Sequence, residues 1–296
     1  MLRAPRMTAY SYMMRTTVFR ASRHLRPMAT EAHATQWHHG SPPLVRDPYM
    51  PALLEAQPEP SWPDNDAVEA RAIIAAIMDA RTFAIDRWLE SQSWPPVRTT
   101  RRQIVLVDAG YDTRAYRLGL GQQARIFEVE ADASLLSRKR KILSAAGRAP
   151  RAKVMDVITS ASDTHACAKA LLAAGFDPRV PTRWVLQGPL VEHLEAAPKV
   201  SKMLTMASAH GSAPASGVAA QVLQPAWADF LARAGMPSPP QRSSGAFGTV
   251  GETLEACHLA GWREKRTLHS SDFADMYGRV LHDAFALIFA DADPEQ

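Results

Sequence analysis

The chain has 296 residues, of which 46% are hydrophobic and 22% are charged. This composition supplies enough apolar side chains for a sizeable core and excludes a disordered or low-complexity chain. The two cysteines, Cys167 and Cys257, lie far apart and form no C-x-x-C motif, so we expect buried free thiols in a reducing compartment. The histidines are scattered except for the adjacent pair His38-His39, and we expect no metal site.

The formal net charge of +4 comes from the start of the chain. Residues 1–30 hold six arginines and no acid, and the remainder has 28 lysines and arginines against 30 acids, a net charge of −2. A near-neutral body argues against a broad nucleic-acid-binding surface. No apolar run reaches the ~18 residues that a membrane helix needs. We therefore expect neither a nucleic acid nor a membrane as partner.

The arginine-rich N-terminal segment has an amphipathic pattern. Its apolar residues recur at helical spacing on one face, at Tyr10, Met14, Val18, Ala21 and Leu25. An acid-free, arginine-rich amphipathic segment is typical of a mitochondrial presequence. The alternatives are an unstructured extension, or a true start at Met28 with a cytoplasmic protein. We predict an N-terminal extension over residues 1–40 and one domain over 41–296.

The rest of the chain alternates between strand and helix patterns. A long helix is predicted over 66–92, with Asp64, Asn65 or Asp66 as its N-cap. The predicted strands lie near 104–107, 125–130, 152–155, 183–187, 217–222, 262–267 and 281–289. Further helices are predicted near 132–146, 163–174, 192–208, 225–234 and 250–260.

This alternation predicts an α/β fold with a seven-stranded, mostly parallel sheet and helices on both faces. The last strand follows the sixth with little room for a crossover helix, so we expect it to be antiparallel. In such sheets, ligands bind at the carboxyl ends of the strands, where the winding reverses.

The first strand and the second have the spacing of a nucleotide-binding unit. The apolar run Ile104–Val107 leads into Asp108-Ala109-Gly110, and the next strand ends in the acid Glu130. A glycine there lets the backbone approach a ligand, and the acid can accept hydrogen bonds from both ribose hydroxyls. The alternative is an ordinary turn followed by a solvated helix cap. Neither G-x-G-x-x-G nor a P-loop motif occurs, which disfavours a dinucleotide domain and a P-loop.

The long helix carries an arginine on its apolar stripe. Arg81 lies at the same helical phase as Ile77, Ala84 and Trp88. An arginine that faces a core needs an anionic partner. The alternatives to a ligand contact are a structural salt bridge or a side chain that extends to the edge of the core.

Several motifs resemble one known family. They are LVRDPY at 44–49, ARTFAID at 80–86, GYDTRAYRL at 110–118, FEVEADASLLSRKRKIL at 127–143 and VLQGPL at 185–190. Together they resemble the leucine carboxyl methyltransferase family, whose members are class I S-adenosylmethionine-dependent methyltransferases. The resemblance covers about residues 42–290. It implies the Rossmann-like class I methyltransferase fold and S-adenosyl-L-methionine as cofactor.

The resemblance also implies cofactor-binding residues. Arg81 matches an arginine that contacts the carboxylate of the cofactor's methionine part, and Gly110 keeps the loop close to that part. Glu130 stands in place of an aspartate that binds the ribose. Asp156, after the predicted strand 152–155, matches an acid that reaches the adenine amino group; a turn or helix cap is its alternative role.

Two further candidate cofactor residues depart from the family. Asp108 replaces the first glycine of G-A-G; it either pairs with the cofactor's ammonium or obstructs the loop. Gln187 replaces a glutamate and brings no charge near the cationic cofactor. Residues 189–192 also differ from the family pattern.

We expect an S-adenosylmethionine-dependent O-methyltransferase that acts on a carboxylate, of a protein C-terminus or a small molecule. An ionised carboxylate needs no general base, whereas a phenol or alcohol does, and the sequence shows no base motif. No catalytic residue is predicted, and the protein is expected to be a monomer. Residues 192–260 are expected to line the acceptor pocket. The alternative is a catalytically degenerate protein of the same fold, a cofactor-binding or interaction module, which Asp108 and Gln187 motivate.

Overall fold

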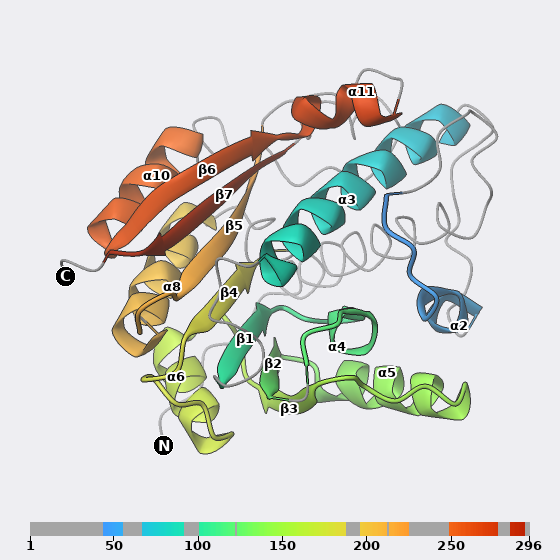
Figure 1. Cartoon of the computed structure of the whole chain (residues 1–296), viewed down its shortest axis with the longest axis horizontal. Coiled ribbons are helices and arrows are strands. Elements are labelled where there is room, and N and C mark those ends of the chain that lie inside the picture. Colours follow the sequence, from blue (N-terminus) through green and yellow to red (C-terminus); the bar gives the residue numbers. More distant parts are fainter. Residues whose placement is uncertain are drawn as a thin grey trace, which may run out of the picture.

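The computed structural model describes residues 44–55, 67–91, 101–121, 123–187, 196–211, 213–224, 249–277 and 285–293, which form a seven-stranded sheet with helices on both faces (Figure 1). The strands are β1 (Arg102–Val107), β2 (Ala124–Glu130), β3 (Lys153–Ile158), β4 (Thr182–Leu186), β5 (Gly217–Leu223), β6 (Trp262–His269) and β7 (Phe285–Ala292). The longer helices are α3 (Ala67–Glu90), α5 (Ala133–Ala145), α6 (Thr164–Ala173), α8 (Ala196–Gly211) and α10 (Val250–Leu259). Shorter ones are α2 (Met50–Glu55), α4 (Arg114–Arg117), the 3-10 helix η1 (Ser270–Phe273) and α11 (Ala274–Tyr277).

The strand order is β3-β2-β1-β4-β5-β7-β6. Strands β1 to β5 are parallel to one another, and β7 lies between β5 and β6 and is antiparallel to both. The chain winds outward from β1 to β3 and then returns to β4 on the other side of β1. The winding therefore reverses between β1 and β4, and the carboxyl ends of these two strands mark the place where such sheets bind ligands.

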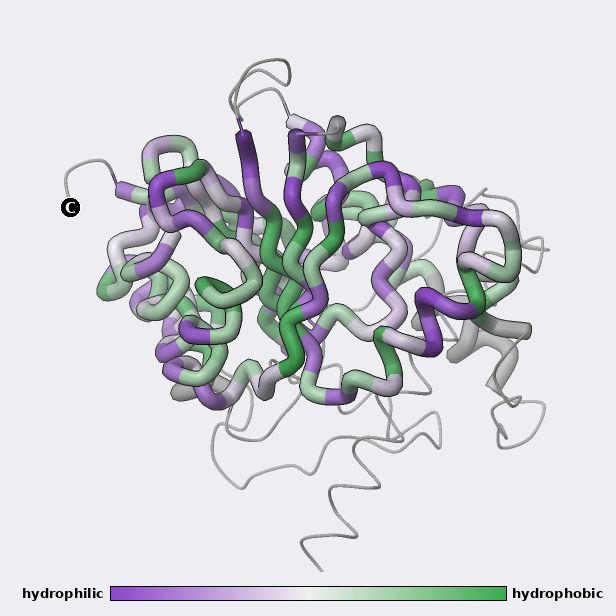
Figure 2. The backbone as a smooth tube through the Cα atoms, turned by 90° about the horizontal axis from the view of Figure 1, so that it is seen from below, coloured by the Kyte–Doolittle hydropathy of each residue, from purple (hydrophilic) through white to green (hydrophobic). Residues whose placement is uncertain are grey.

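The sheet separates two hydrophobic cores, because alternate residues of each strand point to opposite faces. Ile104 and Leu106 of β1 pack with α3, α4 and α5, whereas Val105 and Val107 pack with α6, α8 and α10. Figure 2 shows the hydrophobic strands at the centre of the molecule, with hydrophilic residues concentrated toward the loops. Strands buried on both faces read as continuous apolar runs, which explains why the sequence revealed them.

The predicted fold class is confirmed, including the antiparallel last strand. The strand predicted over 152–155 was too short: β3 continues to Ile158, because the charge of Asp156 is compensated by Arg140 and does not end the strand. The last strand is described from Phe285 and α8 from Ala196, and the starts predicted at residues 281 and 192 lie outside the described residues. The helix predicted over 225–234 and the N-cap predicted at 64–66 lie outside the described residues.

Polar side chains begin three of the helices. Asp132 accepts a hydrogen bond from the backbone N–H of Ser134 at the start of α5, and Asp163 accepts one from Ala166 at the start of α6. Thr249 and Glu252 form a reciprocal capping box at the start of α10. Each cap satisfies backbone donors that a helix leaves without internal partners, which contributes about 1 kcal/mol.

A buried aspartate of α3 joins distant parts of the chain. Asp79 accepts hydrogen bonds from the backbone N–H groups of Leu44 and Val45, at 2.7 and 3.1 Å, and from the hydroxyl of Tyr277 at 2.6 Å. Burial and the charge of Asp79 both raise the pKa of Tyr277, so this hydroxyl stays protonated and donates. The contacts hold both the segment before α2 and the end of α11 against α3.

The two cysteines lie on α6 and α10 and are buried and free, as predicted. Burial raises the pKa of each thiol to about 12, so neither is a reactive thiolate at neutral pH. Among the described helices, none combines the length and apolar character needed to cross a membrane.

The close contact between α8 and β4 predicts that replacing Gly211 destabilises the protein. A Cβ added to Gly211 would meet the indole Nε1 of Trp184 at 2.6 Å, and Trp184 is fully buried. Gly211→Ala should therefore cost about 1–3 kcal/mol in free energy of unfolding, measured by urea denaturation. Gly119→Ala is the matched control, because a Cβ there meets nothing within 4 Å. Equal stability of the two variants would contradict the packing described.

Candidate functional site

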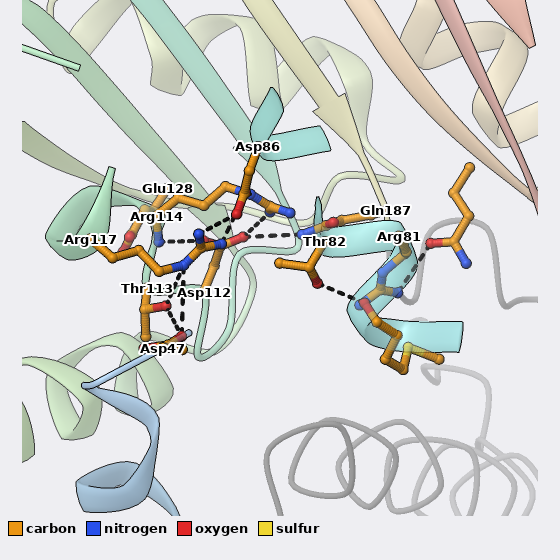
Figure 3. Close-up of polar contacts among 12 residues, drawn as sticks. Asp47, Arg81, Thr82, Asp86, Asp112, Thr113, Arg114, Arg117, Glu128 and Gln187 are labelled. Atoms are coloured by element: carbon orange, nitrogen blue, oxygen red, sulfur yellow. Dashed lines mark hydrogen bonds and ion pairs between the residues drawn. The ribbon is translucent and has the colours of Figure 1, made fainter. Parts of the chain in front are cut away.

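A cluster of buried charges lies at the carboxyl end of β1 (Figure 3). Asp86 of α3 accepts from Arg114 Nε at 2.7 Å and from both terminal nitrogens of Arg117. Arg114 also pairs with Asp112, and Arg117 Nε lies 3.7 Å from Asp47. All five side chains are less than a tenth exposed. Opposite charges brought this close in a buried site hold their three segments together, because removing one partner leaves an uncompensated charge.

Asp112 connects this cluster to β4. Its Oδ1 accepts from the backbone N–H of Arg114 at 2.8 Å, and its Oδ2 accepts from Gln187 Nε2 at 3.1 Å. Burial alone would raise the pKa of Asp112, but the charges of Arg114, Arg117 and Lys139 and the backbone hydrogen bond hold it below its usual value. Asp112 is thus ionised at neutral pH and is a poor general base.

The structure brings together the loop after β1 and Glu130, the residue predicted to bind the ribose. The backbone N–H of Gly110 donates to Glu130 Oε2 at 3.0 Å, and Glu130 Oε1 accepts from the N–H groups of Ala131 and Asp132. Gly110 has a left-handed φ of 47°, which glycine adopts without steric cost. The extra methylene of glutamate lets the carboxylate reach back to the β1 loop while it remains at the end of β2.

Asp108 is a second left-handed residue in the same loop, with φ 53°. A residue with a Cβ is disfavoured in this conformation, and aspartate is among the few that tolerate it. The geometry explains why a glycine stands here in the family pattern. The carboxylate of Asp108 lies close enough to α6 that its charge adds to the effect of burial in raising the pKa of Cys167.

Arg81 faces the sheet from α3, as its helical phase predicted. Its Nη1 donates to the side-chain oxygen of Gln221 on β5 at 3.2 Å. This partner is a neutral amide oxygen, and the contact does not test the anionic partner that the sequence predicted. Contact with the cofactor's carboxylate stays a prediction for this side chain.

Asp156 lies within β3, not after it, and pairs with Arg140 of α5. Arg140 also donates to Glu128 at 3.0 Å, and Glu128 accepts from Lys139 Nζ at 2.8 Å. The carboxylate of Asp156 is therefore part of an ion-pair group two residues before the end of its strand. Its predicted contact with adenine is untested by this arrangement.

The structure thus groups Gly110, Glu130 and Asp108 around one loop and joins Gln187 to that loop through Asp112. Arg81 approaches β5, and Asp156 belongs to a separate ion-pair group with α5. Sequence reasoning assigned no role to Asp112, Asp86, Arg114 or Arg117. One signal was present: Asp79 and Asp86 lie seven residues apart, on the same face of the helix as the apolar residues Ala76 and Phe83. Among the described residues, no three histidine, cysteine or acidic side chains are placed to hold a metal ion.

Comparison with known proteins assigns the family. The sequence pattern of leucine carboxyl methyltransferases matches residues 25–201, more than half of the chain. The chain belongs to the leucine carboxyl methyltransferase family. It is therefore an S-adenosylmethionine-dependent methyltransferase, and the expected cofactor follows from the family.

Bacterial relatives agree with this assignment. A protein of Mycobacterium avium (strain 104), provisionally named an S-adenosyl-L-methionine-dependent methyltransferase, is 29% identical over 81% of this chain and 78% of the relative. A similarly named protein of Saccharopolyspora erythraea is 31% identical over 57% of this chain and 58% of the relative. Among solved structures, a DUF574 family protein from Streptomyces avermitilis has a TM-score of 0.52 and 13% identity, over 92% of this chain and 97% of that chain. That likeness shows the fold alone.

The residues at the carboxyl ends of β1, β2 and β4 in this chain are of chemical types that can bind S-adenosylmethionine. The β1 loop is backbone with positive φ at Gly110, and Glu130 supplies a carboxylate at the end of β2. Gln187 Oε1 is a buried acceptor to which none of the described residues donates. A cofactor that carries hydroxyls and an ammonium group offers a donor of the kind that Gln187 Oε1 lacks.

The buried charge cluster predicts a large effect from losing one carboxylate. Asp86→Asn should cost about 3–5 kcal/mol in unfolding free energy, because Arg114 and Arg117 lose their shared anion. The midpoint of urea denaturation measures this change. Asp177→Asn is the control, since Asp177 pairs with Arg179 at the surface, and its midpoint should not move measurably. A small effect of Asp86→Asn would mean that the cluster does not hold these segments together.

The left-handed conformation of residue 108 can be tested by comparing two substitutions. Both Asp108→Gly and Asp108→Ala remove the carboxylate, but only glycine relieves the positive φ. Asp108→Gly should be more stable than Asp108→Ala by about 1 kcal/mol, measured by chemical denaturation. Two variants of equal stability would show that the loop does not require this conformation.

Proposed function

We propose that this methyltransferase transfers the methyl group to an oxygen of a carboxylate, on a protein C-terminus or a small acid. When bound, S-adenosylmethionine supplies a methyl group on a sulfonium, and transfer is an in-line displacement in which positioning dominates. The chain's own residues then need to bind the cofactor, orient the acceptor and exclude water. A carboxylate acceptor is already a nucleophile and needs no proton removed.

The observation that carries the proposal is that two acids beside the β1 loop, Asp112 and Glu130, already accept hydrogen bonds from the chain itself. Asp112 is held ionised by two arginines and a lysine, and Glu130 accepts three backbone hydrogen bonds. Neither is placed to accept a proton from a phenol or an alcohol. The prediction that residues 192–260 line the acceptor pocket falls partly outside the described residues and stays a prediction.

Roles for the candidate residues follow from their positions. Glu130 would accept hydrogen bonds from the ribose, and Gly110 would allow the loop to approach the methionine part. Arg81 would bind the methionine carboxylate, exchanging or sharing its bond to Gln221. Asp108 would face the ammonium, and Asp156 would reach the adenine only if its pair with Arg140 opened.

Residues 1–40 lie outside the described part of the chain, so the extension and its mitochondrial role stay predictions from composition. The relatives named above are bacterial and do not support a mitochondrial location. The monomeric state is likewise a prediction.

Cofactor binding is tested by thermal shift and calorimetry. S-Adenosylmethionine at about 100 times its dissociation constant should add roughly 2.7 kcal/mol of apparent stability. Arg81→Ala and Glu130→Gln should each reduce that gain. Arg87→Ala is a matched control on the same helix, because Arg87 is exposed. An unchanged gain in Arg81→Ala and Glu130→Gln would refute their assignment to the cofactor site.

The acceptor class is tested in the same assay by S-adenosylhomocysteine formation. Peptides with a free C-terminal carboxylate are compared with the same peptides amidated, and small acids with their methyl esters. Product from the acids but not from the blocked partners supports the proposal. Product only from phenols or alcohols would overturn the carboxylate assignment. Binding with no product from any acceptor class would favour the cofactor-binding module.

A further inference from the structure

The two ends of the Gln187 side chain have different surroundings. Its Nε2 donates to Asp112 Oδ2 at 3.1 Å, whereas its Oε1 is buried and receives no hydrogen bond from the described residues. Gln187 is only 7% exposed. A buried acceptor without a donor costs about 1–3 kcal/mol, so its persistence at the reversal of the sheet points to a donor on a ligand.

Asp112 determines which end of the amide faces which way. An ionised carboxylate can only accept, so the NH₂ of Gln187 must face Asp112 and the oxygen must face away. Asp112 itself is fixed: Arg114 donates to both of its carboxylate oxygens, and Lys139 Nζ donates to its backbone carbonyl at 3.0 Å. The carbonyl oxygen of Gln187 is therefore directed by a rigid partner and is not free to turn.

Asp112 and Gln187 lie at the place where sheets of this kind bind ligands. Asp112 belongs to the loop after β1, and Gln187 directly follows β4. The pair bridges the two strand ends between which the winding reverses. Gly110 lies two residues before Asp112, and its N–H is bonded to Glu130 at the end of β2.

We propose that Asp112 is a positioning residue that orients Gln187, so that Gln187 Oε1 accepts a hydrogen bond from the ammonium group of the cofactor. The proposal rests on the cofactor binding argued above and adds the means by which a neutral amide replaces the family's glutamate. The oxygen of the amide faces the cation, and its NH₂ group donates a hydrogen bond to Asp112, where a glutamate would bring a second negative charge. The glutamine is in this way matched to its neighbour and is not a sign of lost function.

The proposal predicts that restoring the family's glutamate at position 187 weakens cofactor binding. Gln187→Glu would place a second carboxylate about 3 Å from Asp112, where like charges disfavour each other's ionised forms. The new side chain would then be repelled from its orientation or would carry a proton. Asp112→Asn in addition should rescue it, because an amide at position 112 can donate to the new carboxylate.

The test is a double-mutant cycle on S-adenosylmethionine affinity, measured by calorimetry below the melting temperature of every variant. Gln187→Glu and Asp112→Asn should each weaken binding by about tenfold, and the double variant should recover to within about threefold of the native chain. Effects that simply multiply, or tighter binding by Gln187→Glu alone, would overturn the proposal.

A second ligand separates a contact with the ammonium from general damage to the site. 5′-Methylthioadenosine keeps the adenosine and lacks the amino-acid part. Its affinity should change less than twofold in Gln187→Glu, whereas equal losses for both ligands would refute the contact. Gln103→Glu is the structural control, since Gln103 is also buried and hydrogen-bonded, at the start of β1. It should lower the melting temperature without changing S-adenosylmethionine affinity in the folded protein.

The outcomes distinguish a failure of the proposed function from a failure of the role proposed for Asp112. A native chain that binds no S-adenosylmethionine would defeat the proposed function itself. A native chain that binds it, with no energetic coupling between positions 112 and 187, would defeat only the role of Asp112.

Discussion

The need to neutralise two buried guanidinium groups governs the arrangement of this site. Arg114 and Arg117 lie one turn apart on α4, and their charges are balanced by carboxylates from three different segments. One acid precedes α2, one lies on α3 and one belongs to the β1 loop. Separating any of these segments would leave an ion in a poorly hydrated place, which costs several kcal/mol. The helix, the loop and the N-terminal segment of the domain therefore hold one another in position.

The ion pairs around Arg114 and Arg117 also help to fix the conformation of the loop after β1. Asp112 is fixed within the loop by Arg114, and Gly110 is bonded to Glu130. A loop whose backbone donors and acceptors are already committed loses little further freedom when a ligand binds, which is the physical basis of preorganisation. Among the described residues, Asp112 and Glu130 at this edge already accept hydrogen bonds from the chain itself, which is the basis of the proposed preference for acceptors that are already ionised.

Much of the fold could be predicted from the sequence, because its signals are local. Parallel strands buried on both faces produce apolar runs, and the short spacing before the last strand predicted its antiparallel direction. The end of β3 was misjudged because Asp156 interrupts the apolar run, and its compensation by Arg140 comes from another element. Pairings such as that of Asp86 with Arg117, 31 residues away, leave no trace in a single sequence.

The site was predictable to the extent that each residue follows a strand or lies on a helical stripe. Arg81 was placed correctly on the core-facing side of α3, yet its partner on β5 is 140 residues distant and is an amide. The substitution of glutamate by glutamine at position 187 looked like a loss in isolation. Its pairing with Asp112 depends on a contact across 75 residues and changes the interpretation.

The place of β7 in the sheet also constrains the order in which the protein forms during synthesis. This strand is the last of the described strands in the sequence, yet it lies between β5 and β6 in the sheet. Until the ribosome has released it, the hydrogen-bonding groups along one side of β5 have no permanent neighbour, and β6 cannot join the sheet. A nascent chain therefore presents an open strand edge, the kind of surface that recruits other chains. A variant that lacks residues 285–292 would carry that edge permanently, so we expect deletions within β7 to be poorly tolerated.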